Sequence, residues 1–165
     1  MTYALVDSPI GPLTVVGEDD ALSGLYMHQG RHVPDVAGFG QRDDAAHPAA
    51  RRQLAEYFAG ERQQFTVPLR PRGSEFQRTV WSALAEIPYG QTCSYGELTA
   101  RLGLTPQAVR AVAGANGRNP ISILLPCHRV IGADGRLTGY AGGLPRKQFL
   151  LDLERPPAAR EQLLF

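Results

Sequence analysis

Cysteine is scarce in this chain, with Cys93 and Cys127 the only two among 165 residues. Two cysteines cannot form the disulfide framework of a small secreted domain, so we expect both to be free thiols in a reducing compartment. Neither belongs to a CxxC pair, which excludes a cysteine-rich zinc site. Three of the four histidines lie in loop-like stretches and are expected at the surface, without a metal: His28, His32 and His47.

Long apolar runs and targeting signals are also missing. No run approaches the roughly 20 apolar residues that span a bilayer, and Met1–Ala4 lacks the basic and then apolar pattern of a signal peptide. We therefore expect a cytoplasmic protein without membrane contact. With 43% hydrophobic and 20% charged residues, the composition is that of a globular chain of one large domain or two small ones.

Lysine is nearly absent, since Lys147 is the single lysine among 17 basic residues. Residues 1–72 hold 7 basic and 9 acidic residues, whereas residues 73–165 hold 10 basic and 7 acidic residues. The net charge of +1 predicts no polyanionic partner by itself. Arginine suits contacts with phosphates and bases, so the second half is compatible with nucleic acid, although genomic base composition alone can favour arginine.

Short strands are expected in the first third of the chain. Residues 28–47 are polar and without period, which predicts a loop, and Pro48 with Gly60 predicts a helix over residues 48–58. Before them, apolar runs separated by turn residues predict an antiparallel meander with strands at Tyr3–Val6, Leu13–Val16 and Leu22–Met27.

A domain boundary is expected near residue 72. Phe65–Leu69 alternates and can add a strand, and the following Arg70-Pro71-Arg72-Gly73 is typical of a linker. We therefore predict an α+β fold, with a small N-terminal α/β domain containing an antiparallel sheet at residues 1–72. A mainly helical C-terminal domain is predicted at residues 73–165.

The second domain begins with a strong helix signal. Ser74 and Gln77 have the spacing of a capping box, and Pro88-Tyr89-Gly90 ends the helix. Trp81 is expected in the core. Apolar residues recur at three- and four-residue spacing, which predicts one buried face carrying Phe76, Val80, Leu84 and Ile87.

Two further short helices fit a helix-turn-helix. Ser94 and Glu97 predict a second capping box, at the start of a helix through about residue 101. Thr105 as cap, with proline at the first helical position, predicts a helix to about residue 113. Two such helices joined by a glycine-containing turn, the second with an exposed arginine, match a DNA-binding motif. The inward side chains of this second helix are expected to be Val109 and Val112.

The run Pro126-Cys127-His128-Arg129-Val130 carries the strongest signal for chemistry. A thiol is a good nucleophile only as thiolate, which a nearby base or positive charge makes accessible at neutral pH. The preceding Ile121–Leu125 is almost entirely apolar, which predicts a half-buried sulfur. Glu154 on the closing helix could orient the imidazole of His128 as the acid of a hydrolase triad does.

The closing segment Leu144–Leu153 is predicted to be an amphipathic helix. The flexible residues 140–143 before it could form a wing beside the helix-turn-helix, and the tail from Arg155 is expected to fray. A nucleophile joined to a DNA-binding module suggests chemistry on a base, which requires the base to leave the stack. The inward side chains of the closing helix are expected to be Phe149, Leu150 and Leu153.

These motifs closely resemble those of the O6-alkylguanine-DNA alkyltransferases, also called methylated-DNA–protein-cysteine methyltransferases. The cysteine pentapeptide is highly specific, and the other matches follow in the family's order and spacing. The likeness is strongest over residues 73–154 and extends more weakly to Ser8–Leu13. The further matches are Phe76-Gln77, Trp81, Ile87-Pro88-Tyr89-Gly90, Ser94-Tyr95, Arg110-Ala111-Val112, Asn119-Pro120 and Tyr140-Ala141-Gly142-Gly143-Leu144.

The resemblance implies a ribonuclease H-like first domain, a winged helix-turn-helix second domain and a self-inactivating DNA repair protein without a cofactor. Cys127 would take the alkyl group from O6 of guanine, and from O4 of thymine, and would keep it as a thioether. His128 would act as the base through a bound water, with Glu154 orienting it and Asn119 bracing the cysteine loop. The Tyr95 hydroxyl would hydrogen-bond the departing base and offset its charge.

The resemblance also implies a pocket for the alkylated base. Backbone carbonyls of Cys127 and Val130 would accept from the exocyclic amine of guanine. Tyr140 would form a wall of the pocket, the N–H of Ala141 would face O6, and Gly142 would belong to the same substrate-binding set.

For DNA, the resemblance implies minor-groove binding of a duplex, with nucleotide flipping, by a chain that is monomeric in solution. Arg110 would fill the hole left by the flipped nucleotide, and flipping costs on the order of a few kcal/mol. Small residues suit the minor groove. Cooperative assembly on DNA stays open. The other residues expected to contact DNA are Ser94, Thr105, Gln107, Ala111 and Gly114.

This chain departs from the family's pattern at two positions near the expected pocket. It has Ala141 where many relatives carry serine, and Ser122 where some carry proline, so the tolerated size of the alkyl group could differ. The zinc ligands that some relatives carry in the first domain are missing.

Three other functions stay open. A lesion-binding relative would recognise damage without transfer, but such relatives replace the cysteine. A cysteine hydrolase would need Cys127 and His128 in contact, whereas neighbours on an extended segment point apart. A thiol-sensing transcription factor with a winged helix would use the sulfur as a switch. Cys93 is expected to be inert.

Overall fold

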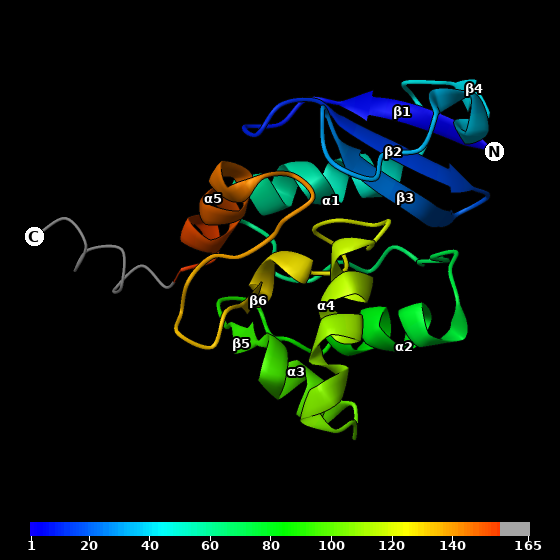
Figure 1. Ribbon diagram of the computed structural model, residues 1–165. Coiled ribbons are helices and arrows are strands. Elements are labelled where there is room, and N and C mark those ends of the chain that lie inside the picture. The colour runs from blue at the N-terminus through cyan, green and yellow to red at the C-terminus, as the bar shows by residue number, and fades with distance from the viewer. Residues whose placement is uncertain (156–165) are drawn as a thin grey trace, which may run out of the picture.

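The computed structural model describes residues 1–155, and its N-terminal region is built on a four-stranded sheet (Figure 1). The three predicted strands are confirmed as an antiparallel meander of β1 (Thr2–Val6), β2 (Leu13–Glu18) and β3 (Ala21–Met27). Alternate residues of these strands face the core, and Leu13, Val15 and Leu25 are fully buried there.

The prediction of a plain loop over residues 28–47 is wrong in part. This stretch contains the 3-10 turn η1 (Val36–Phe39) and the short strand β4 (Gln41–Arg42). β4 runs parallel to β1 and completes the strand order β3-β2-β1-β4. A strand of two residues has no periodicity to detect, and its partner lies at the start of the chain.

The helix α1 (Pro48–Phe58) begins at Pro48 as predicted and packs against the sheet. In Figure 1 it lies between the sheet and α5. Phe65–Leu69 forms no strand of the sheet, which corrects the sequence-based expectation. It makes a single bridge to β3, where Leu22 donates its N–H to Pro68 and accepts from Arg70. Pro68 has no N–H to donate, so this segment cannot extend a regular ladder.

The C-terminal region begins with α2 (Glu75–Leu84), and the predicted capping box between Ser74 and Gln77 is present in both directions. The predicted burial of Val80, Leu84 and Ile87 is confirmed, and so is the core position of Trp81. The prediction for Phe76 is wrong, because this side chain lies in the first turn, before the buried part of the helix, and is 39% exposed.

Two helices follow as a helix-turn-helix. α3 (Tyr95–Arg101) is capped by Ser94, whose hydroxyl accepts the N–H of Glu97; the reciprocal bond of a full capping box is not among its described contacts. The second helix starts as the 3-10 turn η2 (Pro106–Ala108) and continues as α4 (Val109–Gly117). Its cap residue Thr105 makes no side-chain capping bond.

The helix α4 ends later than residue 113, where its end was predicted. Trp81 donates its ring N–H to the carbonyl of Ala115 (2.8 Å), so a contact with α2 stabilises the last turn. Val112 is buried as predicted, whereas Val109 is half-buried. The helix therefore extends past its local sequence signals because tertiary packing supports it.

The last elements bring the cysteine motif beside the helix-turn-helix. β5 (Cys93–Ser94) pairs in parallel with β6 (Val130–Ile131), which directly follows the 3-10 turn η3 (Cys127–Arg129). α5 (Leu144–Glu154) closes the described chain. The predicted fraying of the tail beyond residue 155 lies outside the described residues.

The inward face of α5 differs from its prediction. Leu150 is buried as expected and Leu153 is half-buried, but Phe149 is 37% exposed. The charged residues Lys147 and Glu154 of the same helix are buried instead. A hydrophobic pattern misassigns this face because the helix presents charged groups inward. The whole is an α+β fold, and no described helix has the length and apolar character needed to cross a membrane.

Candidate active site

The segment that leads to Cys127 is buried and is held between the two regions. All of residues 121–130 are buried. Leu25 of β3 donates its N–H to the carbonyl of Pro120 (2.8 Å) and accepts the N–H of Ser122 (3.3 Å). The edge of the N-terminal sheet therefore pairs with the chain just before the cysteine.

Asn119 ties the same segment together with its side chain. Its Nδ2 donates to the carbonyl of Leu125 (2.7 Å), and its Oδ1 accepts the N–H of Ile121 (2.9 Å). Between them Ile123 has a φ of 74°, in the left-handed region that β-branched residues rarely adopt. Such a backbone persists only where its surroundings over-determine it, and the Asn119 amide supplies two of the bonds that do so.

Cys127 opens the turn η3 and is 4% exposed. Burial raises the pKa of its thiol, against the opposing influence of Asn119 and of the Lys147 ammonium. The resting sulfur is therefore a thiol at neutral pH, and a nucleophilic reaction needs a base. Successive side chains of a 3-10 turn diverge by about 120°. The side chains of Cys127 and His128 thus point to different sides of a 3-10 turn. The sequence-based expectation was that they would point apart on an extended segment.

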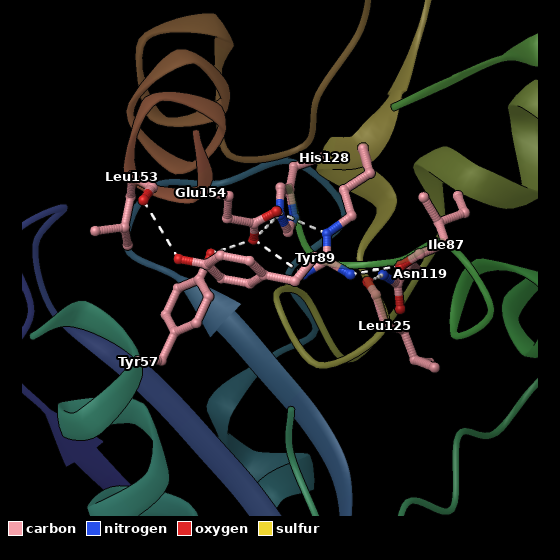
Figure 2. A network of polar contacts seen from close by, with 9 residues as sticks. Tyr57, Ile87, Tyr89, Asn119, Leu125, His128, Leu153 and Glu154 are labelled. Carbon is pink, nitrogen blue, oxygen red and sulfur yellow. Dashed lines mark hydrogen bonds and ion pairs between the residues drawn. The ribbon is translucent and has the colours of Figure 1, made fainter. Parts of the chain in front are cut away.

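Glu154 and His128 meet as predicted, in a buried network that Figure 2 shows. His128 Nε2 lies 2.7 Å from Glu154 Oε2, and both side chains are almost completely buried. Arg129 adds a fork to the same carboxylate, with Nε 2.7 Å from Oε1 and Nη2 3.1 Å from Oε2. The Tyr57 hydroxyl also donates to Oε2, at 2.5 Å.

The charges of this network fix the state of the imidazole. Burial alone would raise the pKa of Glu154, but bonds to His128 and Arg129 lower it to about 2, so the carboxylate is ionised. Arg129 neutralises that charge, and burial lowers the pKa of His128. His128 is therefore neutral at pH 7. An ionised carboxylate only accepts, so Nε2 carries the proton and Nδ1 keeps its lone pair.

The Nδ1 atom of His128 is the free end of this network. It is buried and has no hydrogen-bond partner among the described residues. A neutral imidazole with a buried lone pair is a competent base. The carboxylate on the other nitrogen holds the tautomer in place, as the aspartate of a hydrolase triad does.

Lys147 is a buried cation behind the site that the sequence analysis missed. It donates from Nζ to the carbonyls of Val130 (2.7 Å) and Thr138 (2.8 Å). Burial lowers its pKa to about 8. Its position as the single lysine, in a chain that otherwise uses arginine, is the only sequence signal that could have singled it out.

Three of the residues expected to hold a base, Tyr95, Tyr140 and Ala141, line a pocket of about 280 Å³, and its lining does not include Val130, Gly142 or Cys127. The half-buried Tyr95 comes from the start of α3, and Tyr140, whose pKa is raised well above its ordinary value by burial, comes from the loop before α5. The pocket also has a wall from the N-terminal region, which the sequence analysis did not predict. Its lining includes Tyr95, Gly117, Tyr140, Ala141, Arg31 and His32.

The loop at residues 140–143 is fixed to the N-terminal region. Arg31 donates its N–H to the carbonyl of Ala141 (2.7 Å). The Arg146 side chain bonds to the carbonyls of Ile10 (3.0 Å) and His28 (2.7 Å). A Cβ added to Gly142 would lie 2.3 Å from the sulfur of Met27, so a larger residue there would displace the Met27 side chain. The loop is therefore packed between the two regions.

The carbonyls proposed for base recognition already take part in the fold. Cys127 accepts the N–H of Val130, and Val130 accepts Lys147 Nζ. A carbonyl has two lone pairs, so one bond within the fold does not by itself prevent a second bond to a ligand.

The residues expected to contact DNA gather on the helix-turn-helix. Arg110 is exposed on the first turn of α4. A Cβ built on Gly114 meets no atom within 4 Å, so packing within this chain does not require glycine there. Ser94 instead caps α3 and is half-buried. The other members of this set are exposed: Thr105, Gln107 and Ala111.

Besides Lys147, three other residues of the site could not be identified from the sequence, for different reasons. Tyr57 lies 97 residues before its partner Glu154, and no local pattern links them. Arg129 belongs to the cysteine pentapeptide, but nothing in the sequence indicates that its side chain is buried. Arg31 lies in a stretch without periodicity, and only the fold brings it to the pocket.

Comparison with known proteins assigns the chain to a family. Residues 1–71 match the family model of the ribonuclease-like domain of 6-O-methylguanine DNA methyltransferase, and residues 75–156 match the model of its DNA-binding domain. The two matches together span most of the 165 residues, so this chain belongs to the 6-O-methylguanine DNA methyltransferase family.

Individual relatives match along nearly their full length. A methylated-DNA–protein-cysteine methyltransferase of Mycolicibacterium paratuberculosis is 53% identical over 163 residues, which cover 99% of this chain and 98% of the relative. A methylated-DNA–protein-cysteine methyltransferase of Methanosarcina acetivorans is 50% identical over 154 residues, which cover 93% of this chain and 98% of the relative. The crystal structure of Mycobacterium tuberculosis OGT in complex with DNA superposes with a TM-score of 0.89 at 50% identity, over 93% of each chain.

Proposed function

We propose that this protein repairs alkylated DNA by moving the alkyl group of O6-alkylguanine, and of O4-alkylthymine, to its own Cys127, once per molecule. The observation that carries the proposal is the buried Cys127 thiol, followed directly in the sequence by a neutral imidazole whose tautomer a carboxylate holds. Membership of the family and the activity in the names of its relatives support the same reaction.

In the proposed reaction the sulfur attacks the alkyl carbon and the carbon–O6 bond breaks, with its electron pair remaining on O6. The thiol proton passes to His128 Nδ1 through a bridging water, because the two side chains leave different sides of η3. The imidazolium returns this proton through water to the purine, which becomes guanine, so the products are a thioether, a repaired base and a neutral His128. The Tyr95 hydroxyl stabilises the charge that develops on the ring.

The thioether makes the reaction terminal. A thioether sulfur has no proton to lose and forms no thiolate, so the nucleophile is not regenerated. The protein is therefore consumed with each lesion that it repairs.

For DNA, we propose that the helix-turn-helix lies in the minor groove and that the lesion is flipped into the pocket beside Tyr95 and Tyr140. Arg110 would enter the stack in place of the flipped nucleotide. The exposed Ala111 and Gly114 would allow the close approach of a groove wall. The chain would act as a monomer.

The division of the chain and its compartment complete the proposal. We place the domain boundary at residues 72 and 73, between the matches to the two family models. A free, reactive thiol requires reducing conditions, which supports action in the cytoplasm.

The test compares the two cysteines. Cys127→Ser should abolish transfer from a duplex that contains O6-methylguanine and should retain binding of that duplex. Cys93→Ser is the matched control, because Cys93 is also a buried free thiol, and it should transfer normally. Transfer by the Cys127→Ser variant would refute the assignment of the nucleophile. Tight binding without transfer by the unmodified protein would indicate a lesion-binding protein.

A further inference from the structure

The carboxylate that orients His128 receives a hydrogen bond from the N-terminal region. Tyr57 lies in α1 of the N-terminal region, and its hydroxyl donates to Glu154 Oε2 at 2.5 Å. Figure 2 shows Tyr57 and His128 converging on Glu154 from different elements. The orienting group of the site is thus shared between the two regions.

The position of the Tyr57 ring is fixed by packing. The residue has no exposed surface, and three aromatic rings surround it, with centroids 5.2 to 6.3 Å away: Phe58, Phe65 and Tyr89. Two of these contacts are edge-to-face, which is a favoured geometry for aromatic pairs. Because packing holds the ring in this way, the Tyr57 hydroxyl is held against the carboxylate of Glu154.

This hydroxyl competes with His128 for one oxygen. Glu154 Oε2 accepts from Tyr57, from His128 Nε2 and from Arg129 Nη2, whereas Oε1 accepts from Arg129 Nε. A donor that binds a carboxylate oxygen withdraws charge from it. Each additional donor on Oε2 therefore weakens the attraction of that oxygen for an imidazolium proton.

Other ionisable groups face the same carboxylate and imidazole. Arg129 lies on η3 and stacks on the ring of Tyr89, at 5.7 Å from the centroid. Tyr140, on the loop before α5, faces the carboxylate, and Lys147, on α5, faces the imidazole. Cys127 directly precedes His128 on η3. Arg129 and Lys147 both disfavour a proton on His128 through their charge. Tyr57 differs from these two because it acts on Glu154 without bringing a charge.

We propose that Tyr57 is a positioning residue of the transfer reaction, through which the N-terminal domain keeps the His128 imidazole neutral and thus available as the base. The inference rests on the proposed function of Cys127 and His128. It assigns to the N-terminal domain a part in the chemistry, besides its part in packing.

The direct test is Tyr57→Phe in the full-length protein, which removes one oxygen and retains the ring. Without the competing donor, Glu154 binds an imidazolium more strongly, so the pKa of His128 rises. The acid limb of the single-turnover rate of methyl transfer should move to higher pH by about one unit, which equals about a tenfold lower rate at a pH on that limb. The plateau rate at higher pH should be retained.

The control is Tyr26→Phe, which removes a hydroxyl from a half-buried tyrosine of the same domain whose ring stacks on Phe39. Its pH profile should coincide with that of the unmodified protein. NMR titration of the His128 ring gives a second measurement that is independent of turnover, and it should show a higher pKa in Tyr57→Phe than in Tyr26→Phe.

The outcomes distinguish a failure of the role of Tyr57 from a failure of the proposed methyl transfer to Cys127. If the unmodified protein transfers no methyl group, the proposed function fails. If it transfers, but Tyr57→Phe has an unmoved acid limb and an unmoved His128 pKa, the inference is overturned. A lower plateau with an unmoved limb also overturns it, because that result indicates a packing role alone.

Discussion

The two regions of this protein use their buried space differently. Among the described residues of the N-terminal region, Gln53 and Tyr57 are the polar side chains that are buried, and most of the interior is apolar. The C-terminal region buries many polar and charged side chains: Thr99, Asn116, Asn119, Ser122, His128, Arg129, Lys147 and Glu154. Burial of polar groups costs free energy unless each finds a partner, so a region that accepts so many is organised around chemistry.

The contrast has a limit that is equally informative. The N-terminal region is not a bystander, because β3 pairs with the segment before Cys127, Arg31 reaches the pocket, and Tyr57 reaches Glu154. A sheet with an apolar core is a rigid support. The irregular backbone of residues 119–127, which includes the left-handed Ile123, is held in part by that support.

The largest effect on stability is expected for Glu154→Ala. This change leaves Arg129 and His128 buried without their partner, and breaking a buried ion pair in this way costs about 3–5 kcal/mol. Urea denaturation should show that loss. In the N-terminal region Glu56→Ala removes a partly exposed acid 3.6 Å from Arg62, and it should cost less than about 1 kcal/mol. Equal losses in the two variants would contradict the contrast between the regions.

The acid dependence of stability should also come from the C-terminal region. The pKa of Glu154 is lowered from 4.5 to about 2 in the folded protein. Its contribution is complete above pH 4.5 and is lost as the pH falls from there toward 2, a change of about 3 kcal/mol. His128, whose pKa is lowered by burial, adds a loss as the pH falls below its ordinary value of 6.5.

Denaturation midpoints at a series of pH values measure this dependence. The Glu154→Gln variant should show a flatter profile between pH 4.5 and 2, because an amide does not titrate there. An unchanged profile in this variant would assign the acid sensitivity to other carboxylates.

Two buried amides form a matched pair across the regions. Asn119 bonds to two backbone groups of the cysteine segment. Gln53 bonds to Thr66 in a similar way, through Nε2 to the hydroxyl (2.7 Å) and Oε1 to the N–H (3.0 Å). Asn119→Ala leaves buried backbone groups unpaired and should cost about 1–3 kcal/mol. Gln53→Ala frees only groups of the exposed Thr66, which water can reach, and should cost less. Only Asn119→Ala should slow methyl transfer, measured in single turnover. A comparable slowing by Gln53→Ala would show that the two amides do not differ in their effect on methyl transfer.

The smallest expected effect on the folded protein is that of Arg110→Ala, which changes an exposed side chain. Its stability should be nearly unchanged. Transfer from duplex DNA should slow about tenfold if the side chain fills the flipped nucleotide's place, which corresponds to about 1.4 kcal/mol. Reaction with free O6-benzylguanine should keep its rate, because no nucleotide is flipped. Equal losses with the two substrates would remove the hole-filling role.

Local sequence patterns predicted those parts of the fold that local contacts stabilise. The meander of β1 to β3 follows from alternation and turn residues, and Ser74 with Gln77 forms the capping box that their spacing indicates. The strand β4 and the late end of α4 depend on distant partners, namely β1 and Trp81. No window of neighbouring residues contains that information.

The site divides in the same way. Cys127 and His128 are adjacent in the sequence, and Glu154 lies on the next helix; the contact between His128 and Glu154 could be predicted and is present in the structure. The burial of Lys147 and the exposure of Phe149 could not, because a hydrophobic pattern assumes that charged residues face water. Tyr57 and Arg31 reach the site only through the packing of the two regions.

Counting methyl groups gives the most decisive result on the fate of a repaired lesion. The protein is incubated with an excess of duplex that carries O6-methylguanine with a labelled methyl group, and the label is followed by peptide mass spectrometry. Transfer should stop at one methyl per protein molecule, with all of the label on the sulfur of Cys127. Label released to solvent, or several methyl groups removed per molecule, would contradict a terminal thioether at this residue.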